Sequence, residues 1–253
     1  MKRSSALSGL VLSLVAFTAS AAEIRAYGPG GPMPAMKEAA AKFQQVTGNK
    51  VEVTAGPTPN WIEGARADAD LMFSGSETMM TDFVAAMNGQ IKSEDVEPLY
   101  LRASAILVRP GNPKKIGSFA DLLKSDMKVM VVQGAGQTGM WEDIAGRKGD
   151  IETVKQLRKN IGTFAPNSAA AKEAWSKDES FDAWIIWTIW QKADPKLADV
   201  VEIEHELRVY RDTGVVPTER GKAKPEVASF IGFLEGNEGR EIFKNWGWIT
   251  DRP

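Results

Sequence analysis

The 253-residue sequence has no cysteine and a single histidine, His205. Without cysteine the chain cannot form disulfides, thiolate nucleophiles or cysteine-ligated metal centres, and one histidine cannot supply a multi-histidine metal site. A serine–histidine–acid triad would have to use His205, which lies in the charged stretch 202–206 and looks like an exposed strand residue. No nucleophile-elbow pentapeptide occurs. We therefore expect a protein that is not an enzyme and that uses no cofactor and no metal.

The sequence also lacks an excess of either charge. Its 31 Lys and Arg residues against 33 Asp and Glu residues give a net charge of -2. Such a balance provides no basic field for a phosphate backbone or an anionic membrane, so nucleic acid is not an expected partner. The length and the 43% content of hydrophobic residues suffice for one large domain or two modest lobes with a real core, which excludes a disordered chain.

A long apolar run occurs only near the N-terminus, over residues 6–17. Lys2 and Arg3 precede this run and the small residues 19–22 follow it, which is the pattern of a secretory signal peptide. The run is shorter than the roughly 20 apolar residues that a membrane span needs. We predict cleavage after Ala22, which leaves 29 basic against 33 acidic side chains, a balance of -4, and places the mature protein in the periplasm without a membrane span.

Strand patterns, glycine turns and helix patterns alternate along the rest of the chain. Strands are expected at 24–27, 50–54, 69–73, 99–108 and 128–132, with extended chain again at 162–165, from 181 and over 200–210. Helices are expected at 34–46, with Gly48 behind the helix, and at 118–124, with Ser118 as the cap. Two further helices are expected to follow turns: one runs from the turn at 74–77 to about 87, and one runs from the glycine turn at 134–139 to about 144. The remaining helices are expected at 151–160, at 169–175 and twice within 224–246. This order predicts an α/β fold with a largely parallel sheet.

Four turns rich in glycine or hydroxyl residues follow predicted strands and open predicted helices. They lie at 28–31, 74–76, 136–139 and 167–168. Helix N-termini present unpaired backbone N–H groups and a partial positive charge, so several of them in one crevice can bind an anion. Each turn alone also has an ordinary explanation, because 74–77 fits a capping box that starts at Ser74 and Asn167 is a common N-cap.

The turn Gly134-x-Gly136-x-x-Gly139 matches the dinucleotide-binding fingerprint in its spacing. That fingerprint also requires an acidic residue about 20 positions further on to hold the ribose hydroxyl groups. Residues 154–165 contain no acid. The same backbone amides are better interpreted as oxyanion donors.

Four further side chains could reach a ligand. Arg102 lies where the chain is expected to pass between lobes and could bind a carboxylate or phosphate, or else form a surface salt bridge. Trp61, Trp184 and Tyr210 could line a pocket, although core packing explains such aromatic residues equally well.

Seven segments in register resemble one family. They are Tyr27-Gly28-Pro29-Gly30-Gly31-Pro32, the strand 69–73 with its serine-rich turn, Gly134-Ala135-Gly136, Trp141-Glu142-Asp143, Pro166-Asn167-Ser168, Asp182-Ala183-Trp184-Ile185 and Val209-Tyr210-Arg211. Together they resemble the AcfC-type accessory colonization factors, which are relatives of the molybdate- and sulfate-binding periplasmic proteins and include phosphoglycerate- and citrate-binding antigens of enteric pathogens. The resemblance runs from about residue 24 to 249. It implies a type II periplasmic-binding-protein fold, with two α/β lobes, two crossover strands and a small anion between them, and makes dimers plausible.

The sequence departs from this family in one loop. Members carry a longer loop rich in Ser, Thr and Gly after Gly-Ala-Gly, with a Lys, whereas only Gln137, Thr138 and Gly139 stand there in this chain. The missing donors and positive charge fall in the expected ligand loop. This difference leaves room for a smaller or less charged ligand than a phosphorylated acid or a tricarboxylate.

We therefore expect a periplasmic solute-binding protein that clamps a small anion by hinge closure, with an ABC permease or a sensor as a further partner and a monomeric or homodimeric state. Lobe 1 is expected to comprise residues 23–102 and 209–253, and lobe 2 residues 103–208. A surface adhesin with a secondary cleft remains an alternative, and an exported hydrolase a weaker one. The expected ligand-binding residues are Gly30, Gly31, Trp61, Ser74, Ser76, Arg102, Gln137, Thr138, Gly139, Asn167, Ser168, Trp184 and Tyr210.

Overall fold

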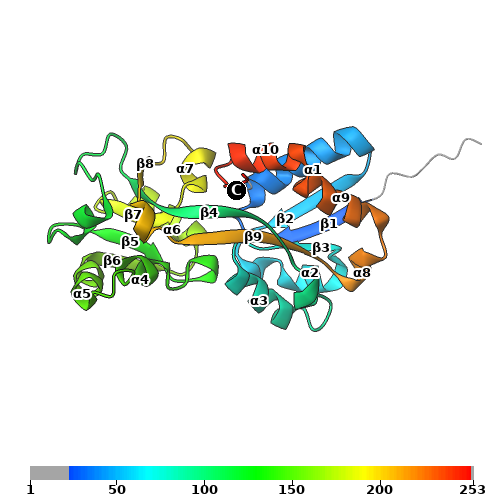
Figure 1. Cartoon of the computed structure of the whole chain (residues 1–253), viewed down its shortest axis with the longest axis horizontal. Helices are drawn as coiled ribbons and strands as arrows, with labels where there is room; N and C mark the ends of the chain where they lie inside the picture. Colours follow the sequence, from blue (N-terminus) through cyan, green and yellow to red (C-terminus); the bar gives the residue numbers. More distant parts are fainter. Residues whose placement is uncertain (1–22, 252–253) are drawn as a thin grey trace, which may run out of the picture.

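A computed structural model describes residues 23–251, so the predicted signal peptide lies outside the described residues. The described chain forms two α/β lobes side by side (Figure 1). The strands are β1 (Glu23–Gly28), β2 (Lys50–Ala55), β3 (Leu71–Phe73), β4 (Glu97–Val108), β5 (Val129–Val132), β6 (Ile161–Ala165), β7 (Ala183–Trp187), β8 (Asp199–Glu202) and β9 (Tyr210–Pro217). The helices are α1 (Met33–Thr47), α2 (Ile62–Asp68), α3 (Glu77–Ala86), α4 (Met140–Ala145), α5 (Ile151–Asn160), α6 (Ser168–Lys177), α7 (Ile189–Ala193), α8 (Glu219–Lys222), α9 (Pro225–Glu235) and α10 (Asn237–Asn245).

The first lobe is built on parallel strands in the order β2-β1-β3, and β9 adds to β3 in the antiparallel direction. Helices cover both faces of this sheet. Phe43 of α1, Phe230 of α9 and Phe243 of α10 pack in one core cluster. Trp61 and Phe83, which belong to the segments around α2 and α3, pack in another. Figure 1 shows α1, α9 and α10 on one side of the strands and α2 and α3 on the other.

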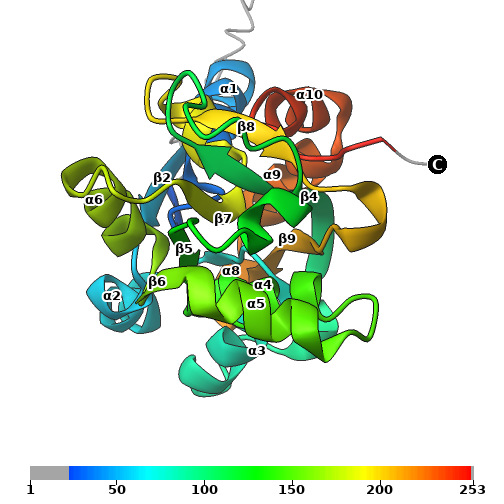
Figure 2. The ribbon, with the colours of Figure 1, turned by 90° about the vertical axis from the view of Figure 1, so that its left-hand side faces the viewer.

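The second lobe has the parallel order β7-β5-β6, and β4 pairs antiparallel with both β7 and β8. Its core is one large cluster that includes the fully buried Trp175, Trp184 and Trp187. Figure 2 faces this lobe and shows α5 and α6 on different sides of its strands. The expected parallel sheet is therefore present in each lobe, but every pairing that involves β4 or β9 is antiparallel.

Two long strands connect the lobes. β4 pairs with β9 from Glu97 to Ala103, and from Ser104 onward it pairs with β7 and β8 of the second lobe. In the shared segment Arg102 lies opposite Arg211. In Figure 1, β4 and β9 run side by side from one lobe to the other. Since both strands continue into a sheet, the passage between the lobes is made of paired backbone rather than a loose linker.

The local predictions were confirmed at several helix ends. The helix Ile151–Asn160 has the expected bounds, and Gly48 behind α1 adopts the left-handed conformation with φ 79°.

Two predictions were wrong. The capping residue of α3 is Ser76, not Ser74, because the Ser76 hydroxyl accepts a hydrogen bond from the Met79 N–H.

The second wrong prediction concerns residues 200–210, which are not one extended segment. β8 ends at Glu202 and β9 begins at Tyr210, and a 3₁₀ turn, His205–Leu207, lies between them. His205 is exposed as expected, but in this turn rather than on a strand. The turn buries Leu207 in the second lobe's core, which a strand of alternating charged residues would not do.

The 3₁₀ segment Phe119–Leu123 provides a stability prediction. Asp121 accepts hydrogen bonds from the N–H groups of Gly117 and Ser118, completing a capping box, and pairs with Lys124 at 2.8 Å. The Lys124 ammonium and these N–H donors lower the pKa of Asp121 to about 2. Asp121→Asn should therefore cost about 1 kcal/mol of unfolding free energy at pH 7.

This cost should depend on pH in one direction. A carboxyl with a lowered folded-state pKa stabilises the fold above its unfolded value of 3.8 and loses that effect as the pH falls through about 2. Urea unfolding of both proteins at pH 7 and near pH 2.5 measures the difference. A gap between the two proteins that widens on acidification would contradict the assignment of the shift to Asp121.

Candidate functional site

A cavity of about 500 Å³ lies between the two lobes. The first lobe contributes the turn after β1, residues 56–59 and one face of α3, and the second lobe contributes Gln137, residues 166–169 and Trp190. Arg102, on the crossover strand β4, also lines the cavity. The carboxyl ends of strands from both lobes open toward this space, which is the usual place for a ligand in an open α/β sheet.

Arg102 is the most unusual residue of the cavity. It is only 4% exposed, and no carboxylate of the described residues lies within salt-bridge distance of it. Its guanidinium carbon lies 4.5 Å from the ring centre of Trp187 in the second lobe and 4.8 Å from that of Trp248 in the first. Nη2 donates to the Gly75 carbonyl at 2.7 Å, whereas Nε and Nη1 have no partner within residues 23–251. Buried donors without partners are costly, so these two point to a missing acceptor.

Two glycines of the first lobe allow the guanidinium to come this close. A Cβ atom added at Gly31 would lie 2.7 Å from Arg102 Nη1, and one at Gly75 would lie 2.7 Å from Nη2. A side chain at either position would require the guanidinium to move from its present place. The turns after β1 and β3 therefore form a seat for this cation, which explains the glycines in both turns.

The charges near the hinge depend on burial. Burial lowers the pKa of Arg102 to about 9, and the carboxylate of Asp212 offsets part of this effect. Arg102 therefore remains protonated at neutral pH. Burial also raises the pKa of Glu77 at the start of α3, and the neighbouring Asp212 carboxyl raises it further. The hinge region thus combines a buried cation, Arg102, with a carboxyl group, Glu77, whose ionisation is disfavoured.

The second lobe presents polar groups to the same cavity. Gln137 is only 6% exposed. In the amide orientation that satisfies its neighbours, its side-chain oxygen accepts hydrogen bonds from Trp187 Nε1 at 2.8 Å and from Ser168 Oγ at 3.3 Å. Its side-chain nitrogen then donates to the Gly134 carbonyl at 2.9 Å. Asn167 caps α6, since its Oδ1 accepts from the Ala170 N–H at 2.9 Å. Asn167 therefore lines the cavity and is also the ordinary N-cap that the sequence allowed.

Trp190 lines the cavity, whereas Trp184 does not. Trp184 is fully buried, and Trp190 stacks on it with ring centres 6.5 Å apart and an angle of 28°. The far end of the Trp190 ring lies 3.8 Å from the Cβ position of Gly30, so this indole spans from the second lobe to the first. Its Nε1 is another buried donor without a partner in the described chain.

Six of the expected ligand-binding residues line the cavity: Gly30, Gly31, Arg102, Gln137, Asn167 and Ser168. The other seven do not: Trp61, Ser74, Ser76, Thr138, Gly139, Trp184 and Tyr210. Trp61 packs in the first lobe and donates to the Gly56 carbonyl, and the Ser74 hydroxyl accepts from the Gly214 N–H of β9. Ser76 caps α3, and Thr138 is exposed.

The sequence analysis missed one wall of the cavity, which α3 provides through Met79, Asp82, Phe83 and Ala86. Their spacing places them on one face of the helix. That spacing was visible in the sequence. It carries no anion signal, because an anion site is recognised by hydrogen-bond donors and these four residues offer mainly apolar side chains.

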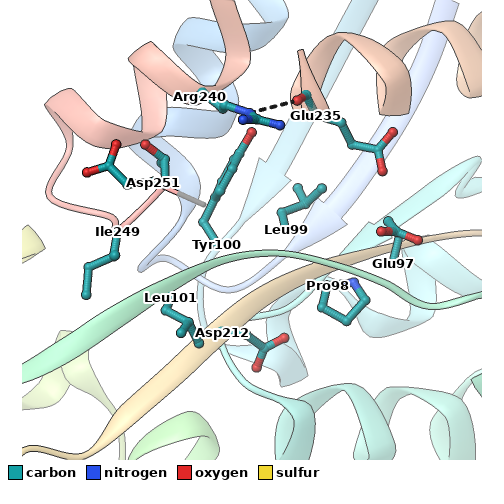
Figure 3. Close-up of a pocket in the computed structure, with 11 residues that line it drawn as sticks. Glu97, Pro98, Leu99, Tyr100, Leu101, Asp212, Glu235, Arg240, Ile249 and Asp251 are labelled. Atoms are coloured by element: carbon teal, nitrogen blue, oxygen red, sulfur yellow. Dashed lines mark hydrogen bonds between the residues drawn. The ribbon is translucent and has the colours of Figure 1, made fainter. Parts of the chain in front are cut away.

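A second cavity of about 250 Å³ lies beside the crossover strands and contains none of the expected residues. Figure 3 shows Tyr100 pointing from β4 toward Arg240, whose Nε donates to the Glu235 carbonyl at 3.2 Å. Asp212 and Ile249 also line this space. Its lining includes several carboxylates and one Arg, so it does not resemble an anion site.

The exported-hydrolase alternative depends on where His205 lies. His205 lines neither cavity, so the hydrolase alternative lacks the placement it requires. Within residues 23–251, no group of three His, Cys, Asp or Glu side chains is arranged to hold a metal ion. No helix in the same range has the length and apolar character of a membrane span.

Known proteins share this fold. A structure of PEB3 with bound L-phospholactate is 39% identical in sequence, covers 90% of this chain and 100% of its own, and has a TM-score of 0.86. A structure of PEB3 from Campylobacter jejuni has the same sequence identity of 39% and the same coverage of 90% and 100%, with a TM-score of 0.84. The Mycobacterium tuberculosis sulfate-binding protein SubI is 17% identical, covers 92% of this chain and 88% of its own, and has a TM-score of 0.73, a likeness of fold alone. No curated protein sequence matches the chain.

These likenesses define the architecture, a type II periplasmic-binding-protein fold with β4 and β9 as its two crossover strands. The family of bacterial extracellular solute-binding proteins matches residues 24–249, almost the whole of the described chain. The family is described as solute-binding, and the similar structures include a sulfate-binding protein and a phospholactate-bound protein. The chain therefore belongs to the bacterial extracellular solute-binding proteins.

Proposed function

We propose that this protein binds a small organic or inorganic anion in the cavity between its lobes and closes around it. The observation that carries this proposal is Arg102, a buried cation with two unpaired N–H donors at the edge of the cavity. An anion there would supply the missing acceptors and neutralise the charge. The L-phospholactate bound to PEB3, whose sequence is 39% identical, supports an anion as the ligand.

In this proposal the ligand first meets the seat of Arg102, Gly31 and Gly75. Gln137, Asn167 and Ser168 then approach from the other lobe as β4 and β9 flex. The lobes comprise residues 23–102 with 209–253, and 103–208. A ligand that contacts both lobes binds the closed state more tightly than the open one, and this difference drives closure.

The biological setting is also part of the proposal. We infer an AcfC-type protein, exported by cleavage after Ala22 and working in the periplasm as a monomer or homodimer. An ABC permease or a sensor would receive the loaded protein. The family description as extracellular solute-binding proteins supports this setting.

A thermal-shift series on refolded, ligand-free protein tests the function. Sulfate, molybdate, phosphate, citrate and L-phospholactate are titrated separately. A ligand that binds only the folded state raises stability by RT ln(1 + [L]/Kd), about 2.7 kcal/mol at 100 times Kd, so at least one anion should raise the melting temperature by several degrees. Melting temperatures that stay constant with all anions, including those tested below, would count against the proposed function.

A further inference from the structure

The wall of the cavity between the lobes is mostly apolar. Met79, Phe83 and Ala86 form a continuous face of α3, and Trp190 contributes from the second lobe. Prolines on the loops at 29–32 and 57–59 add further apolar surface without N–H donors. A cavity of about 500 Å³ with such a wall lies within the 300–1,000 Å³ range typical of small organic ligands. A bare oxyanion would leave most of this apolar surface without contact.

In the part of the chain that the structure describes, the cavity lining carries one cation and one carboxylate. The cation is Arg102, and the carboxylate is Asp82 on the same face of α3 as Phe83. Asp82 is exposed and has no ion pair or hydrogen bond within residues 23–251. A binder of dianions or trianions would gain nothing from a free carboxylate in its cavity, because like charges repel.

The two charges are separated along the length of α3. Arg102 binds the carbonyl of Gly75, immediately before the N-cap Ser76, and so lies at the start of α3. Asp82 follows Ser76 by six residues, which is about 9 Å along a helix that rises 1.5 Å per residue. Met79 lies between them on the same face. A ligand that met both charges would have to be an extended molecule with separate ends.

We propose that the cavity takes an amphipathic acid with one carboxylate, an apolar body and a cationic amine at its far end. The carboxylate meets the free donors of Arg102, the apolar body packs between α3 and Trp190, and the amine pairs with Asp82. This inference rests on the proposed function and specifies its ligand. It also gives a reason for the short, lysine-free turn at Gln137, Thr138 and Gly139, because a ligand with one carboxylate needs no second cation.

Three acids of equal chain length test the inference, since they differ only at the far end. They are 6-aminohexanoate with an ammonium, hexanoate with a methyl group and adipate with a second carboxylate. Exposed charge pairs contribute about 0.2–1 kcal/mol, and here the amine gains one pair while adipate meets one repulsion. Calorimetry on refolded protein should therefore give 6-aminohexanoate about tenfold higher affinity than adipate, with hexanoate between them.

Variants of Asp82 test whether this order of affinities depends on the Asp82 carboxylate. Asp82→Asn should reduce the ratio between 6-aminohexanoate and adipate to about twofold or less, and Asp82→Lys should reverse the order. Glu94→Gln is the control, because Glu94 is an exposed carboxylate of the first lobe that lines neither cavity. It should leave the ratio unchanged.

Three results would overturn the inference alone. The first is adipate that binds the unaltered protein at least as tightly as 6-aminohexanoate. The second is a ratio that Asp82→Asn does not change. The third is binding of sulfate or L-phospholactate without binding of any of the three acids, which would leave the proposed function standing. If neither the acids nor the anions bind, both the inference and the proposed function are wrong.

Discussion

Replacing Arg102 by methionine is expected to weaken binding of the anionic ligand by at least about 100-fold. The guanidinium supplies two free donors, and among residues 23–251 it is the only cationic side chain in the lining of the cavity between the lobes. Loss of a buried charge-assisted contact of this kind typically costs about 2–5 kcal/mol of binding free energy. Calorimetry with the tightest ligand of the thermal-shift series measures the change.

The same substitution should leave the unfolding free energy of the ligand-free protein within about 1 kcal/mol, or raise it. Methionine removes two unpaired buried donors and a desolvated charge, which offsets the loss of the contacts with Trp187 and Trp248. Urea unfolding without ligand measures this. A variant that loses several kcal/mol of stability would show that Arg102 is mainly a structural residue.

Two companion variants sharpen the result. Arg102→Lys keeps a charge but lacks the planar fork, so its affinity should fall between those of the native protein and the methionine variant. Arg240→Met changes an arginine that lines the second cavity instead. Its ligand affinity should match that of the native protein, and a similar loss in both methionine variants would argue against a specific role for Arg102.

Arg102 could be predicted from the sequence because its position depends on chain order. The predicted strand 99–108 lies where the chain is expected to pass between the lobes, which places Arg102 on that passage. The partners that bury it could not be predicted. Trp187 and Trp248 are 61 residues apart in the sequence, and both contact Arg102 only because β4 carries this residue between the two lobes.

The aromatic residues show a different limit. Trp184 and Trp187 lie in β7, a strand buried on both faces, so no alternation of polar residues indicates which side chain points to a ligand. Trp190 reaches the cavity because α7 begins just after the strand and turns the chain. The three-residue spacing was visible in the sequence, but the switch from strand to helix between Trp187 and Trp190 was not.

Hydroxyl residues in turns were ambiguous for a related reason. Ser74 and Ser76 are both fully buried and two residues apart. Ser74 is held by Gly214 of β9, a contact over 140 positions that follows from the crossover topology. Ser76 caps α3. Local pattern limits the choice to a few turn residues, and long-range strand pairing then decides which of them face the cavity.

Gly134→Ala is expected to cost at least about 3 kcal/mol of unfolding free energy. A Cβ atom at Gly134 would lie 2.0 Å from the carbonyl oxygen of Pro166, which is backbone and cannot swing aside like a flexible side chain. The loops after β5 and β6 would have to separate. Chemical unfolding at neutral pH measures the loss of stability.

The control is Gly232→Ala in the middle of α9, where nothing lies within 4 Å of the added methyl group. Alanine there should raise stability by about 0.5–1 kcal/mol, because it reduces the freedom of the unfolded chain and favours the helix. A Gly134→Ala protein as stable as this control would contradict the close approach of the two loops.

Gly134→Ala should also weaken ligand binding in the fraction of the protein that remains folded. Gly134 holds the loop of Gln137 against the loop of Asn167 and Ser168, and all three of these side chains line the cavity. A separation of about 1 Å there would move the second lobe's polar groups out of hydrogen-bond range of a ligand seated on Arg102. Gly134 therefore accounts for part of the dinucleotide-like glycine pattern without any nucleotide, because it allows two backbone loops to touch where the second lobe lines the cavity.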